Sequence, residues 1–477
     1  MNGNGIQIRF DGQVVDLPKD FKVDIERVSP YLTFEDILSP RTTIPALPAT
    51  ARNRQILGYP DLLQSDNVAF QYECQTYFNG QLINQGIGVI TEVAEAGYSF
   101  GVVQALGQFF GDYQTELLTE IDLGTVAIPA PLTAVVQQGG RDACCFPAMV
   151  NPDFYGSNGG QVGYSWVMND ISGGVYTAEG PKIPMFFVPF VLHRIAQLTG
   201  TTIEGDFLTH PVLSKLFIVN TRALDGAASA DVARHLPEMS VATFLLELRK
   251  MFCLKMDIDT VSKRLRLDFL KDMLARPTRL DWSRKAVKQY RKVPETARRL
   301  QLGSDLDSGD ALSKDKPPQL DDYLTPELDT PTQIAQMKTR FSALLMDPDV
   351  GIPALRQQGI TQLFNQGAGK FGARLCLWKG FEENYPVSAS TLYGVSLYWK
   401  SPDGAPGTGL ADVFWRPYIE MRKRQYYASR ELVLTETDLA GLDFSEKIHI
   451  NGVDYLLARV QVSLPIKAPA QCLLVRV

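Results

Sequence analysis

One short motif in this sequence has the spacing of a catalytic nucleophile. Residues 97–101, GYSFG, match G-x-S-x-G, the turn that presents the serine of many hydrolases. That turn requires a parallel βαβ arrangement, and the preceding residues do not have such a pattern. Tyr98 and Phe100 alternate with small residues, which predicts a plain strand. We therefore expect Ser99 not to be catalytic, and a serine hydrolase is the least favoured function.

The other residue types that could do chemistry are not grouped. The histidines never occur at HxH or HxxxH spacing, so a zinc site would need ligands from remote segments. They are His193, His210, His235 and His449. The acidic pairs 321–322 and 382–383 fall where solvated loops are expected, and adjacent residues on an extended segment point apart.

Phosphate-binding motifs are also missing from the sequence. No P-loop and no GxGxxG occurs, and the glycine-rich residues 156–163 lack the Lys-Ser/Thr that would hold a phosphate, which predicts a turn region. The sequence therefore predicts no catalytic residue, no metal ligand and no cofactor.

Length and composition indicate a multidomain globular protein. At 477 residues, about 150 per domain gives three or four domains. Hydrophobic residues make up 45% and charged residues 21%, and the formal net charge of −6 disfavours tight binding of nucleic acid. The longest apolar run, 183–192, is too short to cross a membrane, and no signal peptide is evident, so we expect a soluble chain without a membrane anchor.

The six cysteines lack CxxC spacing, so we expect buried thiols in a reducing compartment. They are Cys74, Cys144, Cys145, Cys253, Cys376 and Cys472.

Residues 239–274 carry the strongest structural pattern in the chain. An apolar stripe with helical spacing follows Ser240, which is placed to cap the first turn. The stripe consists of Val241, Phe244, Leu245, Leu248 and Phe252. Residues 255–258 and 264–269 then predict a β-hairpin. A weaker version precedes it, with a helical stripe from Val188 to Ile195, Gly200 at its end and an extended segment at 201–207. Beyond these two units, no internal repeat is evident.

Both ends of the chain predict antiparallel sheet. Asp11-Gly12, Asn79-Gly80 and Asn451-Gly452 each separate two strand-like runs, and such dipeptides suit tight hairpin turns. In the last of these hairpins, apolar residues at even positions from 456 to 464 alternate with Arg459, Gln461 and Ser463.

Two blocks of opposite charge lie next to each other after the helical middle. Residues 276–299 hold nine Arg or Lys, and residues 303–329 hold eight Asp or Glu. The acidic block predicts an exposed linker or long loop. The basic block is either a solvated face or a contact with another subunit or charged component, and the sequence favours neither.

These patterns predict a β-rich α+β protein divided into five segments. They are an N-terminal β domain at 1–110, a β-rich continuation at 111–182, a helix-plus-hairpin module at 183–275, a charged connection at 276–370 with the acidic loop 303–329, and a C-terminal β domain at 371–477.

Three segments resemble the tail hub proteins of tailed bacteriophages, in the version found in phages and prophages of Bacteroidetes. They are LPATARNRQILGYP at 47–60, HLPEMSVATFLLELRKMFCLKMDID at 235–259 and the final 443–477. The resemblance implies two tube-like antiparallel β-barrel domains per chain with α/β insert domains. It further implies that three chains form a pseudo-sixfold ring matching the hexameric tail tube.

The resemblance also implies partners and a location. A hub contacts the tail tube or distal tail protein and carries a spike or fibres. Tape-measure protein and then DNA pass through its lumen without specific binding. The protein would reside in the virion, at the tail tip or baseplate, after assembly in the bacterial cytoplasm. Because the sequence ends at strand-like residues without a peptidase or muramidase extension, we expect no lytic activity. Contractile and non-contractile tails remain equally open.

The main alternative from another class is a tip adhesin that binds carbohydrate. Its recognition face would use exposed aromatic side chains near the C-terminus, whereas the simpler hypothesis places them in a core. They are Trp399, Trp415, Tyr418, Tyr426 and Tyr427.

Overall fold

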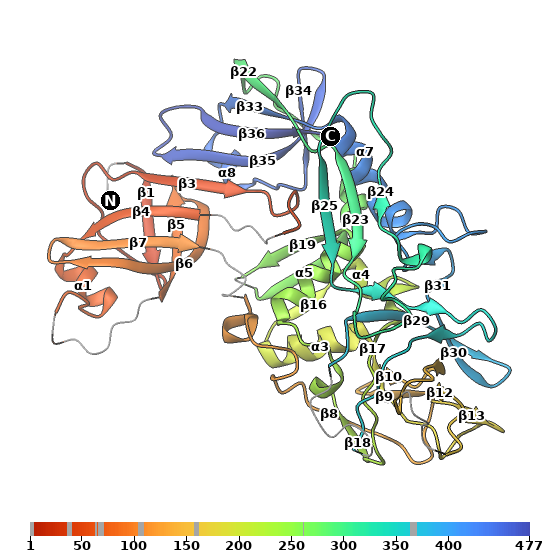
Figure 1. Cartoon of the computed structure of the whole chain (residues 1–477). Coiled ribbons are helices and arrows are strands. Elements are labelled where there is room, and N and C mark those ends of the chain that lie inside the picture. The colour runs from red at the N-terminus through yellow and green to blue at the C-terminus, as the bar shows by residue number, and fades with distance from the viewer. Residues whose placement is uncertain are drawn as a thin grey trace.

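A computed structural model describes residues 4–35, 41–62, 64, 71–103, 109–156, 162–260, 262–362 and 370–477. Figure 1 shows strands of the N-terminal hundred residues on one side, C-terminal strands at the top, and the remaining chain as a mixed α/β body below and to the right. The chain is β-rich with few helices, as the sequence predicts.

The first β unit consists of two antiparallel strand pairs, a short helix and then three antiparallel strands. Its strands are β1 (Ile6–Phe10), β2 (Gln13–Val14), β3 (Val23–Val28), β4 (Arg41–Pro48), β5 (Gln71–Phe78), β6 (Gln81–Ala94) and β7 (Gly97–Val103). Helix α1 (Ala51–Leu57) lies between β4 and β5; its first turn is capped by Thr50, whose side chain accepts from the Asn53 N–H, and it ends at Gly58.

The second β unit has the same plan. Its strands are β22 (Ala286–Pro294), β33 (Tyr426–Leu432), β34 (Lys447–Ile450), β35 (Val453–Leu464) and β36 (Ala470–Arg476). Helix α8 (Glu436–Ala440) lies between β33 and β34 and begins with a capping box at Thr435. The short strand β21 (Leu280–Asp281) pairs with β34.

Strand order reveals that the two units repeat one arrangement. The first unit contains the order β5-β6-β7-β4-β3, and the second contains β34-β35-β36-β33-β22. In each, two antiparallel strands are followed by a helix and then by three strands, the first two of which meet at an Asn-Gly turn. Thus β22 corresponds to β3 and β35 corresponds to β6. The repeat was not evident in the sequence because corresponding strands of the two units differ in length. For example, β5 has eight residues and its counterpart β34 has four.

The two units join edge to edge in one sheet, for which 13 strands are assigned among the described residues. Strand β3 pairs antiparallel with the second half of β35, from Val23 opposite Leu464 to Val28 opposite Arg459. Strands from near the two ends of the sequence are therefore neighbours in one sheet, as Figure 1 shows for β3 and β35.

The middle body contains several small sheets and most of the helices. Its helices are α3 (Val188–Thr199), α4 (Asp206–Thr209), α5 (Val241–Phe252), α6 (Leu270–Ala275) and α7 (Arg416–Arg424). Its strands are β8 (Thr125–Ala127), β9 (Val135–Gln138), β10 (Arg141–Cys145), β11 (Met149–Val150), β12 (Val167–Met168), β13 (Ile171–Ser172), β14 (Val175–Tyr176), β15 (Met185–Phe186), β16 (Thr202–Glu204), β17 (Leu216–Val219), β18 (Ser229–Asp231), β19 (Leu254–Asp259), β20 (Arg264–Phe269), β23 (Arg299–Ser304), β24 (Tyr323–Leu324), β25 (Ile334–Thr339), β26 (Ser342–Ala343), β27 (Leu345–Met346), β28 (Pro353–Ala354), β29 (Arg374–Glu382), β30 (Tyr385–Ala389), β31 (Thr391–Leu392) and β32 (Val395–Ser396).

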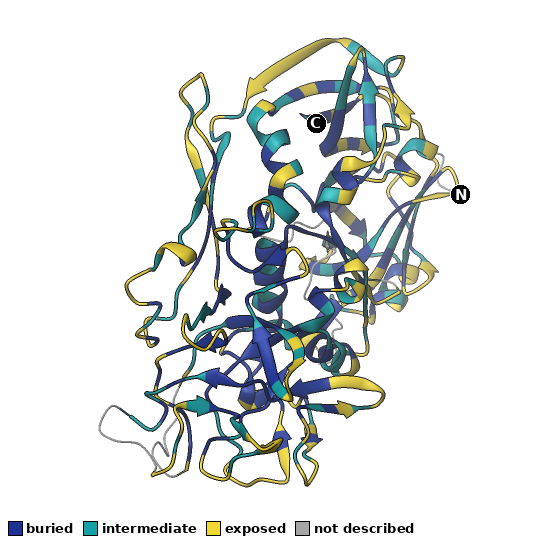
Figure 2. Ribbon diagram, turned by 90° about the vertical axis from the view of Figure 1, so that its right-hand side faces the viewer, coloured by how far each residue is buried: buried dark blue, intermediate teal, exposed yellow. Residues whose placement is uncertain are grey.

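One contiguous cluster of buried apolar residues connects all these parts. Figure 2 shows buried residues concentrated along the interior helices and strands of the middle body, with exposed residues on outer strands and turns. No helix among the described residues has the length and apolar character needed to cross a bilayer.

The local predictions from the sequence are confirmed at the main elements. Ser240 caps α5, whose five stripe residues are all buried, and β19 pairs with β20 as the expected hairpin. The three turns have positive φ at Asp11, Asn79 and Asn451. The segment 201–207 is only partly extended, because after β16 the chain turns at Gly205 and starts α4. The glycine-rich residues 157–161 lie outside the described part.

Strand pairing crosses two of the expected segment limits. β22 comes from the segment expected to be a connection, yet it pairs with β33. β29 and β30 fall within 371–477, yet β29 pairs with β17 of the middle body. Local patterns locate strands but contain no information about partners hundreds of residues away, which is why these pairings were not anticipated.

Candidate functional site

Ser99 lies in a regular strand. It is in the middle of β7, where it faces Glu92 of β6, between the buried side chains of Tyr98 and Phe100. The strand prediction is confirmed, and β7 is antiparallel to both of its neighbours. A nucleophile elbow instead follows a parallel strand and starts a helix, so the motif match does not create that geometry.

The histidines occupy four separate places. His193 is on α3; the His210 Nδ1 accepts hydrogen bonds from the Val212 and Leu213 N–H groups at 3.2 and 3.3 Å. The His449 Nδ1 lies 2.7 Å from Asp454 Oδ1 across the hairpin of β34 and β35. Within the described ranges, no group of three His, Cys, Asp or Glu side chains is arranged to hold a metal ion.

The cysteines are buried and unpaired, as expected. Burial raises the pKa of the Cys74, Cys144, Cys376 and Cys472 thiols to about 12. Thiols with such a pKa are protonated at neutral pH and are poor nucleophiles.

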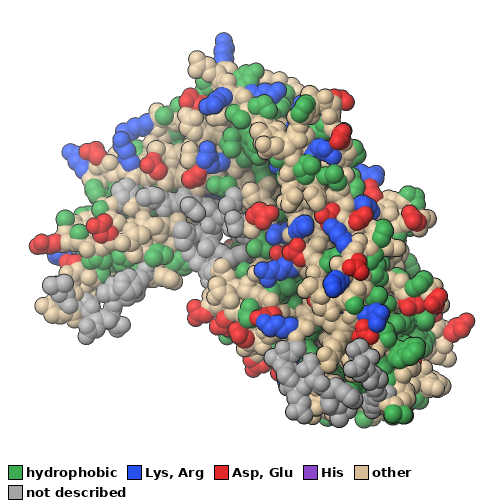
Figure 3. Space-filling model, in the orientation of Figure 1, with side chains coloured by type: hydrophobic (Ala, Val, Ile, Leu, Met, Phe, Trp, Pro, Cys, Tyr) green, Lys and Arg blue, Asp and Glu red, His purple; other side chains and the backbone are tan. Residues whose placement is uncertain are grey.

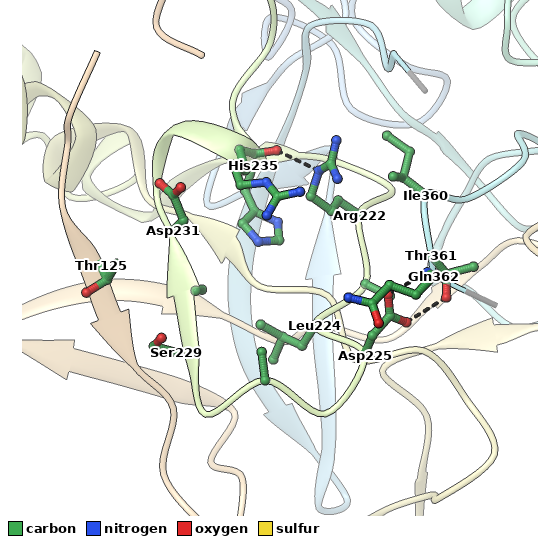
Figure 4. A pocket seen from close by; sticks show the side chains of 14 residues that line it. Thr125, Arg222, Leu224, Asp225, Ser229, Asp231, His235, Ile360, Thr361 and Gln362 are labelled. Carbon is green, nitrogen blue, oxygen red and sulfur yellow. Dashed lines mark hydrogen bonds between the residues drawn. The ribbon is translucent and has the colours of Figure 1, made fainter. Parts of the chain in front are cut away.

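A pocket with a volume of about 780 Å³ lies beside β18 and the segment 222–235. Figure 4 shows two groups of polar side chains in it. Arg222 donates from Nε to the Arg234 carbonyl oxygen at 3.0 Å, and Asp225 accepts from the Thr361 hydroxyl at 2.6 Å and from the Gln362 N–H at 2.8 Å. These polar groups are engaged in holding loops together.

His235 is the titratable group of this pocket that sequence reasoning could have associated with catalysis. It is 4% exposed, and its Nδ1 lies 3.2 Å from Asn220 Oδ1. Burial lowers its pKa to about 3, with further lowering by Arg222 and Arg234. An imidazole with this pKa stays neutral near pH 7 and is poorly matched to general acid catalysis. Among the described residues, the hydrogen-bond partner of His235 is Asn220 and not a hydroxyl group of the pocket.

The acidic block 303–329 was expected to be an exposed linker or long loop, but it contains the end of β23, a 3-10 helix at Pro318–Leu320 and strand β24, and two of its carboxylates turn inward. Arg374 on β29 is 1% exposed and donates from Nη1 to Asp310 at 2.9 Å. Asp307 accepts from the Gln357 amide at 3.1 Å and from the Gly372 N–H at 2.8 Å. These contacts fix the loop to the middle body, so it is not a free linker.

The aromatic residues proposed for an adhesin face are mostly in the core. Trp399, Trp415 and Tyr418 are 3%, 0% and 3% exposed. Tyr426 and Tyr427 are half-buried. The Tyr426 hydroxyl lies 3.2 Å from the Tyr455 hydroxyl, and the Tyr427 hydroxyl donates to the Glu295 carboxylate at 3.1 Å. The core hypothesis is thus confirmed for the first three. On the face seen in Figure 3, acidic and basic side chains are interspersed.

The two β units are joined by side-chain contacts as well as by strand pairing. Besides the β3·β35 strand pair, Arg27 of β3 donates from Nη1 to the Leu439 carbonyl at the end of α8 at 2.7 Å, and from Nη2 to the Leu442 carbonyl at 3.4 Å. The Glu26 carboxylate accepts from Gln461 at 3.1 Å and from Arg459 at 3.5 Å. Helix α8 also packs against β6 of the first unit.

Comparison with known proteins gives distant likeness only. No protein-family model and no curated protein matches the chain. Among solved structures, the 43 kDa tail protein of prophage MuSo2 from Shewanella oneidensis is similar at a TM-score of 0.38 and 9% identity, covering 99% of this chain and 97% of that one.

Two further solved structures are similar over nearly the full length. The tail protein from Neisseria meningitidis MC58 has a TM-score of 0.36 and 9% identity, with 99% and 95% of the two chains covered. Prophage tail protein gp18 from Listeria monocytogenes EGD-e has a TM-score of 0.36 and 10% identity, with 98% and 94% covered.

Proposed function

We propose that this chain is a structural hub protein of a phage tail tip or baseplate, of the Bacteroidetes phage type, and that it acts without catalysis. Three copies close a ring that joins the hexameric tail tube to a spike or fibres. The ring surrounds the passage for tape-measure protein and DNA. The protein resides in the virion after assembly in the bacterial cytoplasm.

The observation that supports this proposal most directly is the repeated β unit. Two equivalent units per chain allow three chains to present six equivalent units, which is the number needed to match a sixfold tube. A ring also covers strand edges that would otherwise promote aggregation. The net charge of −6 suits a conduit that must release DNA.

The mass of the purified protein in solution tests the proposal. We expect light scattering to give a particle of three 53.0 kDa chains, and a reconstruction of the tail tip to show a threefold ring continuous with the tube. A chain that remains monomeric alone and with tube protein, and that is missing from the tail axis, would contradict it.

The two alternative functions make different predictions. An adhesin should be retained by glycans, whereas burial of Trp399, Trp415 and Tyr418 leaves little of the expected recognition face. A serine hydrolase should lose activity in Ser99→Ala. Because Ser99 lies within a regular antiparallel strand, we expect that variant to keep the parent's particle infectivity and any measurable ester or peptidoglycan hydrolysis. Lost hydrolysis would revive the enzyme hypothesis.

A further inference from the structure

Strand β22 is a long, exposed edge of the main sheet. It has nine residues, pairs on one side with β33, and has no strand on its other side among the described residues. Seven of its residues, 288–294, are exposed, including Tyr290 at 65% and Val293 at 42%. An edge of this length presents a row of backbone donors and acceptors to any strand that fits. Lysines on an edge strand can simply prevent unwanted strand pairing. A docking role for β22 therefore requires a second edge that is complementary to it.

The equivalent strand of the first unit has a partner within the chain. β3 corresponds to β22, and it pairs with the second half of β35, beyond the part that pairs with β34. The strand equivalent to β35 is β6. A copy of the same joint would therefore pair β22 with the second half of β6.

Among the described residues, no strand pairs with the outer edge of the second half of β6. β5 pairs with β6 only as far as Val89, and residues 90–94 pair with β7 on the opposite side. Residues 91–94 are exposed, and no described strand covers their outer edge. Both long strands also shift register against the following strand near this half, at Ile90/Glu92 in β6 and at Leu457/Arg459 in β35.

The charges of the two edges are opposite. β22 carries exposed Lys288, Arg291 and Lys292, whereas Glu92 and Glu95 are exposed at the end of β6 and in the turn after it. The joint within the chain also has opposite charges, with its acidic residue Glu26 on β3 and its basic residue Arg459 on β35. The signs are exchanged between the two joints, so each edge favours its own partner over the other.

We propose that β22 of one copy of this chain pairs antiparallel with the second half of β6 in the next copy. This joint rests on the ring of the proposed function and specifies how that ring is closed. The contact is heterologous, because one chain contributes β22 of its second unit and the next chain contributes the second half of β6 in its first unit. Such contacts close a ring when the rotation between copies divides a full turn. The part of the basic block 276–299 that forms β22 is then a subunit contact.

Hydrogen exchange of the intact protein tests the joint without any substitution. We expect backbone amides of residues 288–293 and 90–94 to exchange at least about tenfold more slowly in the assembled protein than in the same protein diluted to the monomer. Exchange in the exposed hairpin between β29 and β30 should not change. An assembled trimer whose β22 and β6 amides exchange as in the monomer would overturn the joint while leaving the ring in place.

Charge reversal gives a second, independent test. Lys288→Glu/Arg291→Glu and Glu92→Lys/Glu95→Lys should each raise the dissociation constant of the assembly by at least about tenfold, and combining all four changes should restore most of the affinity. Lys263→Glu/Lys314→Glu is the matched control, because both lysines are exposed and lie away from either edge in sequence and sheet. Thermal melting of each variant checks that the fold is retained.

The outcomes separate the two proposals. Wild-type protein that never assembles contradicts the ring and, with it, this joint. Wild-type protein that assembles but tolerates both charge reversals, or that is not rescued by the fourfold variant, contradicts the joint alone.

Discussion

At the scale of single residues, His235 should control how acid affects stability. Asn220 donates from Nδ2 to the Pro184 carbonyl and accepts at Oδ1 from the Arg222 N–H, so His235 Nδ1 must be the protonated nitrogen that donates to that oxygen. The buried imidazole is neutral in the folded protein because its pKa is lowered to about 3. In the unfolded chain its pKa returns to about 6.5.

This difference in pKa sets the sign of the first prediction. Below pH 6.5 the unfolded chain binds a proton that the folded chain does not, so stability is complete above pH 6.5 and is lost as pH falls toward 3. The loss attributable to His235 is about 2 kcal/mol at pH 5. Urea unfolding at pH 8 and pH 5 should show that His235→Asn, which cannot titrate, lacks this share of the pH dependence. Equal pH dependence in parent and variant would refute the assignment.

Arg374 is the second residue with a strong expected effect. Its guanidinium donates to Asp310 at 2.9 Å and to the Gln357 side-chain oxygen at 2.5 Å. The side chains of Arg374 and Asp310 are 1% and 3% exposed. Arg374→Met leaves the Asp310 carboxylate buried without its counter-ion, which should cost about 3–5 kcal/mol of unfolding free energy. Adding Asp310→Asn should recover part of that loss.

The matched control for Arg374 is an exposed ion pair of the same chemistry. Arg356 contacts Asp153 at 3.0 Å, with side-chain exposures of 48% and 24%. Arg356→Ala should change stability by about 1 kcal/mol or less. Chemical denaturation of the three variants measures the contrast, and a cost for Arg356→Ala equal to that of Arg374→Met would show that burial is not the deciding factor.

At the scale of elements, α5 should be indispensable to the middle body. Leu245 is 1% exposed. The adjacent Phe244 packs against Phe341, and the centroids of these two rings are 5.7 Å apart. Leu245→Asp places an unpaired charge there and should cost several kcal/mol, on the order of 3–5. The neighbouring Leu246 is only half-buried, so Leu246→Asp should cost clearly less. Thermal melts that are equal for Leu245→Asp and the parent would contradict the packing.

Elements of this kind were predictable because their signals are local. Ser240, the apolar stripe after it and the Asn-Gly turns are each contained in a few consecutive residues, and the structure places the helix and hairpins where those signals are. The buried pair of Arg374 and Asp310 joins residues 64 positions apart, and nothing near either residue specifies the other. The same holds for His235, whose neutral state depends on burial by segments that the sequence does not connect to it.

At the scale of the whole molecule, the defining contact is the one between the two β units. The alternation of 456–464 predicts a strand with one buried face, but it does not predict that its second half pairs with residues 23–28. Either edge of a strand offers the same backbone groups, so the choice of partner depends on the complete fold. For this reason the residues alone did not predict the duplicated strand order, and two barrel domains per chain were expected only from the resemblance to tail hub proteins.

Arg27 provides the test of this joint within one chain. Its guanidinium is bound by the Leu439 and Leu442 carbonyls and lies near the Phe444 ring, 5.9 Å from its centroid, and burial lowers its pKa. Arg27→Ala removes these charged hydrogen bonds and should weaken the joint by about 1.5–3 kcal/mol. Amides of β3 should then exchange faster with deuterium, whereas amides of the β5·β6 hairpin should not, because that hairpin is held inside the first unit.

The comparison variant is Arg459→Ala, which removes the exposed partner of Glu26 across the same joint. Arg459 is 46% exposed and 3.5 Å from that carboxylate, so its loss should change stability by about 1 kcal/mol or less. If the two units are held together as the contacts indicate, Arg27→Ala should also impair assembly, since a loosened joint no longer fixes the angle between β22 and β6 of one chain. Unchanged exchange in β3 together with unchanged assembly in Arg27→Ala would mean that the strand pair alone sets the geometry.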